Sequence, residues 1–245
     1  MSNIGLETMY KVVIMYPMSY KQILIVDFGT QHINSITSVV KSHISPNRIR
    51  VARLNRPGVP SRMLKFSEVE TEDVNMVFAT EHLRQSDAAI ILTGSPDHVG
   101  DQNGFRSINK GVFDKFEGPI LGVCYGHQLI GTILDHDCKM VPHAEHGSTI
   151  FLPRDEAQTD PLFSDFPKAG FVVSVHHNWS LSKVPEGFIN IGETRGTHTI
   201  ISAIRAKNRP IYGVQFHPEL PVSGYWSGLD LMGRFVELAM AGAPV

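Results

Sequence analysis

Short, continuous apolar runs recur in the first half of this chain, at residues 22–26, 87–92 and 119–123. Runs that are apolar throughout, rather than alternating with polar residues, are typical of strands buried on both faces of a sheet. Between them, residues 31–44 and 104–116 carry apolar side chains at helical spacing. Strands that alternate with helices predict an α/β fold in which helices flank a mostly parallel central sheet.

The other segments carry weaker signals. Residues 49–53 predict a further strand, and residues 55–73, with their prolines and acidic side chains, are expected to be mostly irregular. The second half of the chain is richer in strand signals and closes with a helical pattern. The predicted strands are 148–152, 171–175, 188–191, 199–204 and 211–216, and the predicted helix is 227–241.

The domain organisation follows from length and from the position of the first strand. A chain of 245 residues fits one large domain. Residues 1–17 match no element, so we expect residues 1–20 to be an N-terminal extension and residues 21–245 to form the domain. Because termini tolerate loss when nothing ties them down, removal of residues 1–17 should leave the protein folded.

Charge and composition exclude several classes of protein. The chain has 22 Lys and Arg against 24 Asp and Glu, a net charge of −2, so it lacks the positive charge that nucleic-acid binding needs. No run reaches the length of a transmembrane helix, so no membrane association is expected. Cys124 and Cys138 are too few for a disulfide framework and favour a reducing, cytoplasmic location.

The most informative segment is Gly122-Val123-Cys124-Tyr125-Gly126-His127-Gln128, where an apolar strand runs into Cys124 and a helical pattern follows. Glycines two residues either side of a nucleophile permit the tight strand–turn–helix bend that lifts its side chain clear of the sheet. The start of the helix also favours the thiolate. A lone cysteine is more often a buried structural residue, but the paired glycines favour a nucleophile here. Cys138 lacks such surroundings and is expected to be structural.

A thiol nucleophile needs a base, and the base needs a group that orients it. A predicted strand, residues 211–216, is followed by His217-Pro218-Glu219. Pro218 keeps His217 out of the helical region, and residues i and i+2 of an extended chain point the same way. We therefore expect Glu219 to hold one ring nitrogen of His217 while the other faces Cys124. A surface histidine in a turn is the alternative.

These two segments together resemble the class I, triad-type glutamine amidotransferases. The motifs that carry the resemblance are Gly122-x-Cys124-x-Gly126-x-Gln128 and Gln215-Phe216-His217-Pro218-Glu219. Within that family, Val26-Asp27-Phe28-Gly29-Thr30-Gln31 and Leu92-Thr93-Gly94-Ser95-Pro96 are most similar to the glutaminase part of GMP synthetases. The resemblance covers roughly residues 21–221. It implies a flavodoxin- or Rossmann-like three-layer fold with a Cys-His-Glu triad at the C-terminal edge of its sheet.

The resemblance also implies a chemistry. Cys124 would attack the side-chain carboxamide of L-glutamine, and backbone N–H groups of Tyr125 and of the Gly94–Ser95 loop would hold the resulting oxyanion. The residues expected to contact the substrate are Gln128, His146, Gly147, Asn178 and Trp179. No cofactor is expected, and no metal site either, because the histidine-rich segments lack paired zinc-ligand spacing.

Three departures from the GMP-synthetase pattern leave the ammonia acceptor open. Ser95 replaces a second glycine, and residues 175–179 replace a Ser-His-Gly-Asp motif. The Ser-Gly-Gly-x-Asp-Ser loop of an ATP-pyrophosphatase does not occur in the sequence. We therefore expect ammonia to pass to a synthetase or ATP-pyrophosphatase on a partner chain. The alternatives are a free-standing γ-glutamyl hydrolase or peptidase, which would use the same thiol, and a catalytically silent regulatory subunit.

Overall fold

The structure is a computed structural model that describes residues 21–55, 69–75, 83–99, 110–195, 199–222 and 227–242. Its helices are α1 (Ile33–His43), α2 (Lys110–Lys115), α3 (Tyr125–Leu134) and α4 (Gly228–Ala241). Its strands are β1 (Gln22–Asp27), β2 (Ile49–Asn55), β3 (Glu70–Asn75), β4 (Asp87–Leu92), β5 (Ile120–Val123), β6 (Met140–Pro153), β7 (Phe171–Leu181), β8 (Phe188–Arg195), β9 (Thr199–Ala206) and β10 (Ile211–Val214). The expected extension, residues 1–20, lies outside the described residues. None of the described helices is long and apolar enough to cross a membrane.

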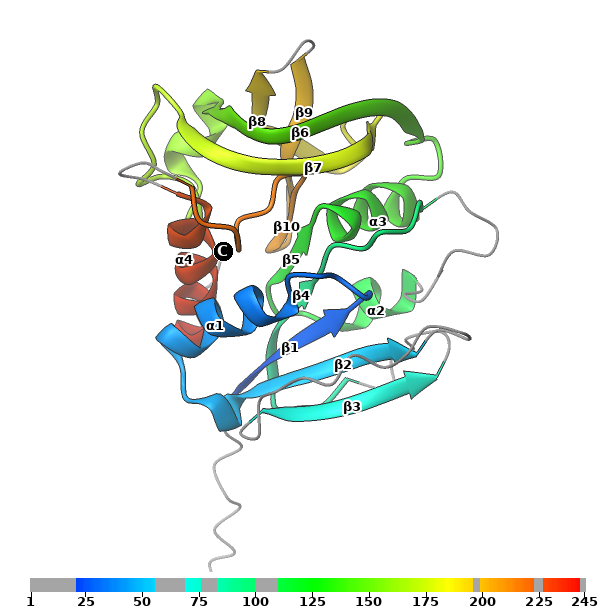
Figure 1. Ribbon diagram of the computed structural model, residues 1–245, viewed down its shortest axis with the longest axis vertical. Helices are drawn as coiled ribbons and strands as arrows, with labels where there is room; N and C mark the ends of the chain where they lie inside the picture. Colours follow the sequence, from blue (N-terminus) through cyan, green and yellow to red (C-terminus); the bar gives the residue numbers. More distant parts are fainter. Residues whose placement is uncertain are drawn as a thin grey trace, which may run out of the picture.

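The described strands form one sheet in the order β3-β2-β1-β4-β5-β10-β9-β8-β6-β7 (Figure 1). Neighbouring strands from β3 to β10 run parallel. The pairs from β10 to β7 are antiparallel. The predicted α/β fold with a parallel central sheet is confirmed, and the strand-rich second half of the chain supplies its antiparallel extension.

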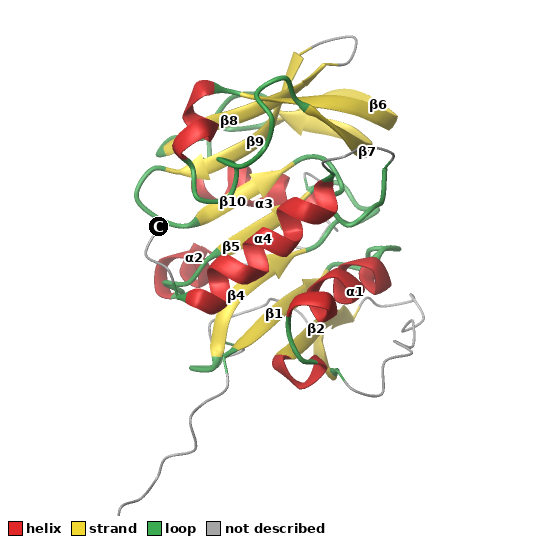
Figure 2. Cartoon of the chain, turned by 90° about the vertical axis from the view of Figure 1, so that its left-hand side faces the viewer, coloured by secondary structure: helices red, strands yellow, loops and turns green. Residues whose placement is uncertain are grey.

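Helices cover both faces of the parallel part, which gives three layers (Figure 2). In β1, Ile23 and Ile25 belong to the apolar core that includes residues of α1 and α4. Leu24 and Val26 belong to the core that includes residues of α2 and α3. Successive side chains of a strand point to opposite faces. Residues 23–26 of this run are all apolar because both faces of β1 are buried there.

Two predictions about local structure were incomplete or wrong. Residues 55–73 were expected to be mostly irregular, but Glu70 begins β3, which pairs in parallel with β2. Among the described strands, β3 has a neighbour on one side only, and such an edge strand tolerates a polar sequence that shows no apolar pattern. The predicted helix 104–116 is present as α2, while residues 104–109 lie outside the described residues.

The antiparallel strands β6 and β7 are longer than the predicted segments 148–152 and 171–175. They pair from Met140–Leu181 to Phe151–Phe171 with one irregularity in register. Most residues of β6 before Phe151 are partly or fully exposed, so they lack the apolar alternation that marks a half-buried strand. The added length matters, because the second half of β7 contributes to the cavity described below.

A buried ion pair joins β2 to β4. The side chains of Arg50 and Asp87 are both fully buried, and two nitrogens of the Arg50 guanidinium bond the two carboxylate oxygens. Removing one partner leaves an uncompensated buried charge, which typically costs about 3–5 kcal/mol. We expect Arg50→Met to lower the free energy of unfolding by that amount in urea denaturation. Arg84→Met, which breaks the exposed pair with Glu70, should cost less than about 1 kcal/mol. Equal losses in the two variants would contradict this account.

Candidate active site

A cavity of about 600 Å³ lies where the chain order of the sheet reverses, between β1 and β4. It is lined by residues 30–32 after β1, residues 95–98 after β4 and residues 174–179 in β7, together with Cys124 and His217. In open α/β sheets, ligands bind outside the carboxyl ends of the strands at such a switch point. The position of the cavity therefore follows from the topology.

Cys124 sits on a sharp bend between β5 and α3. Its backbone has φ 51° and ψ −99°, and it is the one non-glycine residue with positive φ in the described part of the chain. The bend is anchored on both sides: the Cys124 N–H donates to the Val214 carbonyl at 2.8 Å, and the Cys124 carbonyl accepts from the Gln128 N–H at 3.1 Å. A strained backbone that persists only because its surroundings fix it is a feature of functional sites, and this is the bend that the sequence predicted.

The two glycines beside Cys124 are required by close packing. A Cβ on Gly122 would lie 2.6 Å from the backbone of Gly126, and a Cβ on Gly126 would lie 2.4 Å from the Leu92 carbonyl oxygen. Both distances are far inside van der Waals contact. Glycine at these positions lets α3 begin directly against β4 and β5, which brings Cys124 to the cavity.

His217 and Glu219 lie together, as expected. The His217 Nδ1 and Glu219 Oε1 atoms are 2.9 Å apart, and both residues are buried. The route differs from the prediction, because the chain after His217 forms a turn rather than an extended segment: the Leu220 N–H donates to the His217 carbonyl. The His217 N–H in turn donates to the Ser174 carbonyl of β7 at 2.8 Å. With Nδ1 held by Glu219, the Nε2 atom is left for Cys124.

The electrostatic surroundings of His217 favour its charged form. Burial lowers the pKa of His217, but hydrogen bonds and charge interactions with Cys124 and Glu219 raise it, and the net pKa lies well above its ordinary value. The His32 ring lies edge-on to His217 at 5.7 Å, and burial lowers the pKa of His32. The arrangement therefore supports an imidazolium at His217 beside a largely neutral His32.

The loop after β4 packs against both reactive side chains. A Cβ on Gly94 would lie 3.2 Å from the His217 Cε1 atom and 3.8 Å from the Cys124 Cβ atom. The Ser95 hydroxyl donates to the Phe28 carbonyl at 3.0 Å and accepts from the Asp97 N–H at 3.2 Å. The serine that replaces the second glycine thus ties this loop to the one after β1. Tyr125 starts α3, so its backbone N–H lies at an open helix end.

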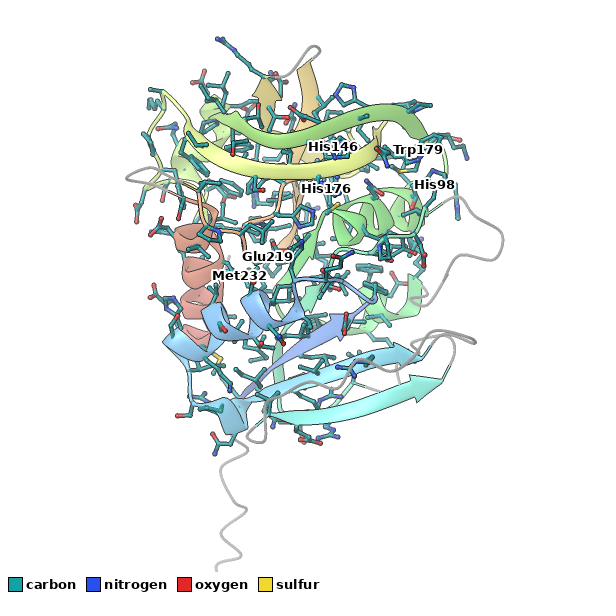
Figure 3. The ribbon with its side chains drawn as sticks, in the orientation of Figure 1. His98, His146, His176, Trp179, Glu219 and Met232 are labelled. Carbon is teal, nitrogen blue, oxygen red and sulfur yellow. The ribbon has the colours of Figure 1, made fainter. Side chains whose placement is uncertain are left out.

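The residues expected to bind substrate are gathered around the cavity with one exception. Gln128, Gly147, Asn178 and Trp179 line it, whereas His146 does not. The His146 Nε2 atom bonds the Asn178 Oδ1 atom at 3.1 Å, and its Nδ1 atom lies 3.1 Å from the His176 Nδ1 atom. Figure 3 shows His146 and His176 on neighbouring strands and His98 beside Trp179. The ring centroids of His98 and Trp179 are 4.1 Å apart.

Several cavity residues had no sequence signal. His32 and His98 line the cavity beside Cys124, yet neither stands in a recognisable motif, and His176, which lies in the segment 175–179 compared with a family motif, had no assigned role. Gln215 was quoted as part of a motif but had no assigned role, and its side-chain nitrogen lies 3.6 Å from the Cys124 sulfur. In the described part of the chain, no group of three or more His, Cys, Asp or Glu side chains has an arrangement that could hold a metal ion.

Comparisons of the sequence with known proteins point to one family. The family glutamine amidotransferase class-I matches residues 48–224. A GMP synthase [glutamine-hydrolyzing] of Staphylococcus saprophyticus is 32% identical over 87% of this chain, and one of Staphylococcus aureus is 31% identical over the same share. This chain spans 35% of the length of those relatives.

Solved structures agree on the fold. A protein of Thermoplasma acidophilum described as a GMP synthase subunit superposes with a TM-score of 0.63 at 20% identity, covering 91% of this chain and 96% of that one. A glutamine amidotransferase of Methylobacillus flagellatus superposes with a TM-score of 0.52 at 14% identity, covering 82% of this chain and 72% of that one. The family match extends over more than half of the chain and includes the Cys124 bend and the His217 turn. The chain belongs to the class-I glutamine amidotransferases.

Proposed function

We propose that this protein hydrolyses L-glutamine to glutamate and ammonia through a thioester on Cys124, with His217 as proton carrier and Glu219 as the group that orients it. One observation carries the proposal. A cysteine on a strained strand–helix bend lines the same cavity as a buried histidine whose Nδ1 atom is held by a carboxylate. Nucleophile, base and orienting group in that order make up a catalytic triad.

The mechanism follows from these contacts. The thiol proton passes to His217 Nε2, and the Cys124 thiolate attacks the carboxamide carbon of glutamine. The oxyanion is held by the backbone N–H groups of Tyr125 and of the Gly94–Ser95 loop, each worth about 10²–10³ in rate. His217 returns its proton to the departing nitrogen, ammonia leaves, and the glutamyl thioester remains. His217 then takes a proton from water, which hydrolyses the thioester and restores the thiol.

The walls of the cavity suit a substrate with an amino-acid end. Gln128, Gly147, Asn178 and Trp179 line it, and we propose that they bind the α-amino and carboxylate groups of glutamine. The Gln128 Nε2 atom already donates to the Trp179 carbonyl at 2.9 Å, so the Gln128 Oε1 atom is the one that would accept from the α-ammonium group. His146 would act from outside the cavity by holding Asn178.

We also propose that a synthetase on a partner chain uses the ammonia, in the cytoplasm. This synthetase would be of the type found in GMP synthases, so the reaction would belong to purine biosynthesis. Two observations support this. The relatives that match 87% of this chain are named GMP synthases. A solved structure with the same fold is described as a GMP synthase subunit. The glutaminase step itself uses no cofactor.

A product assay separates this proposal from its alternatives. Incubated with glutamine, the protein should release glutamate and ammonia in equal amounts, slowly alone and faster with a matching synthetase and its acceptor. γ-Glutamyl peptides should be cleaved poorly. Preferential cleavage of the peptides would instead identify a free-standing γ-glutamyl hydrolase. No product from either substrate, with or without a synthetase, would identify a catalytically silent subunit.

A further inference from the structure

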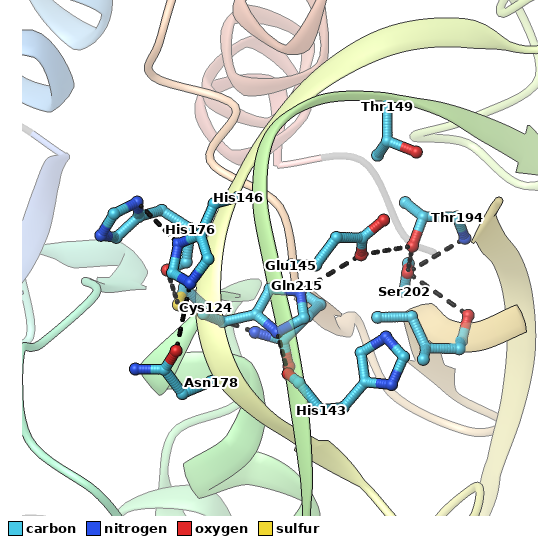
Figure 4. A network of polar contacts seen from close by, with 12 residues as sticks. Cys124, His143, Glu145, His146, Thr149, His176, Asn178, Thr194, Ser202 and Gln215 are labelled. Atoms are coloured by element: carbon cyan, nitrogen blue, oxygen red, sulfur yellow. Dashed lines mark hydrogen bonds and ion pairs between the residues drawn. The ribbon is translucent and has the colours of Figure 1, made fainter. Parts of the chain in front are cut away.

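Gln215 lies directly behind the reactive sulfur. It follows β10, is fully buried, and its Nε2 atom is 3.6 Å from the Cys124 Sγ atom (Figure 4). Its backbone is fixed as well, because the Gln215 N–H donates to the Ser202 carbonyl of β9 at 2.8 Å. A buried amide needs partners for both of its ends, and the other end of this one is held by Gln128.

The orientation of the Gln215 amide is fixed by a chain of hydrogen bonds. The Trp179 carbonyl can only accept, so the end of Gln128 that lies 2.9 Å from it must be the nitrogen. The same Gln128 nitrogen also donates to the side-chain amide of Gln215 at 3.2 Å. The atom of Gln215 that faces Gln128 must therefore be its oxygen. The nitrogen of Gln215 is therefore directed at Cys124, and it presents an N–H to the sulfur.

We propose that Gln215 stabilises the Cys124 thiolate by donating an N–H to its sulfur, and that Gln128 holds the amide in this orientation through the Trp179 carbonyl. The inference rests on the proposed function, in which the thiol gives its proton to His217 Nε2 and leaves the negative charge on Sγ. A hydrogen bond to a charged acceptor is stronger than one to a neutral acceptor. The Gln215 donor therefore favours the thiolate over the thiol.

A competing contact shows why such a donor is needed. The His176 carbonyl oxygen lies 3.9 Å from the Cys124 sulfur, and a carbonyl accepts a hydrogen bond from the thiol but not from the thiolate. Among the described residues, the titratable side chains that line the cavity with the sulfur are His32 before α1, Asp97 and His98 after β4, Tyr125 in α3, His176 and His177 on β7, and His217 with Glu219 behind it. Unlike these groups, the Gln215 amide does not titrate and keeps its N–H at every pH. Removing this donor should therefore shift the midpoint between the thiol and thiolate forms of Cys124.

The test is the pH dependence of Cys124 alkylation by iodoacetamide, read by mass spectrometry in the full-length protein. Only the thiolate reacts. The strength of a hydrogen bond to a charged group corresponds to a shift of about one to two pH units in the midpoint. Gln215→Met, which keeps the length of the side chain without the donor, should raise the alkylation midpoint by about that much, and Gln215→Glu should raise it further. Gln128→Met, which releases the amide, should raise it less.

Matched controls separate this role from a structural one. Gln22→Met, at the opposite end of β1, should leave the midpoint unchanged. If Gln215→Met fails to fold, Gln215→Asn still tests the idea, because its shorter side chain withdraws the nitrogen from the sulfur. Loss of stability with an unchanged midpoint in the folded variants would overturn the role of Gln215. A wild-type Cys124 that reacts no faster than Cys138 would instead overturn the proposed function.

Discussion

Replacing Cys124 with alanine is expected to abolish glutamine hydrolysis, with a fall in kcat of about 10⁶-fold, the size seen when a triad nucleophile is removed. The thioester cannot form without the sulfur, and no other described side chain at the bend can replace it. The fold should survive, because Cys124 keeps its backbone hydrogen bonds to Val214 and Gln128. The measurement is ammonia release from glutamine, with the melting temperature as a check of folding.

Cys138 supplies the matched control. It is also buried, and its thiol donates to the Lys183 carbonyl at 3.3 Å. Burial raises the pKa of Cys138, which keeps it as an unreactive thiol. We expect Cys138→Ala to retain activity, and a glutamine-like electrophile to label Cys124 alone. Labelling of Cys138, or normal turnover by the Cys124→Ala variant, would show that the nucleophile lies elsewhere.

The parts of the fold that could be predicted are those whose sequence reflects their own burial. Residues 22–26 predicted β1 because both faces of that strand are covered by helices, which leaves its inner positions, Ile23 to Val26, without a polar residue. The bend at Cys124 could be predicted because its geometry excludes side chains at Gly122 and Gly126. β3 could not, because it is held by main-chain bonds to β2 at the sheet edge and needs no apolar pattern.

In the candidate site, contacts between residues near in sequence could be predicted, and contacts between distant residues could not. His217 and Glu219 are two residues apart, so their contact could be expected from the chain alone, although a turn rather than an extended segment brings them together. His176 on β7 and Gln215 just after β10 reach Cys124 over sequence separations of 52 and 91 residues. Such contacts depend on the order and register of strands across the whole sheet. The catalytic roles assigned to Cys124, His217 and Glu219 are predictions.

The second large effect is expected at Glu219. Its Oε1 atom bonds His217, and its buried Oε2 atom has no hydrogen-bond partner in the described part of the chain, so its charge acts mainly on the imidazole. Glu219→Gln keeps the shape and removes the charge. In a serine-protease triad, the corresponding exchange of carboxylate for amide lowers kcat by about 10⁴, and we expect a loss of similar size here.

The pH dependence of the same variant gives the sharper test. The Glu219 carboxylate is one of the groups that raise the pKa of His217 above its ordinary value, against the effect of burial. Without it the pKa of His217 falls, and the imidazolium that must protonate the departing nitrogen is lost at lower pH. The basic limb of the kcat profile should therefore move to lower pH in Glu219→Gln.

Glu237→Gln is the matched control, because Glu237 makes the same kind of contact with the Nδ1 atom of His43 at 3.1 Å on the surface between α1 and α4. It should leave both rate and profile unchanged. A basic limb that stays in place, or moves to higher pH, would show that Glu219 does not set the charge of His217.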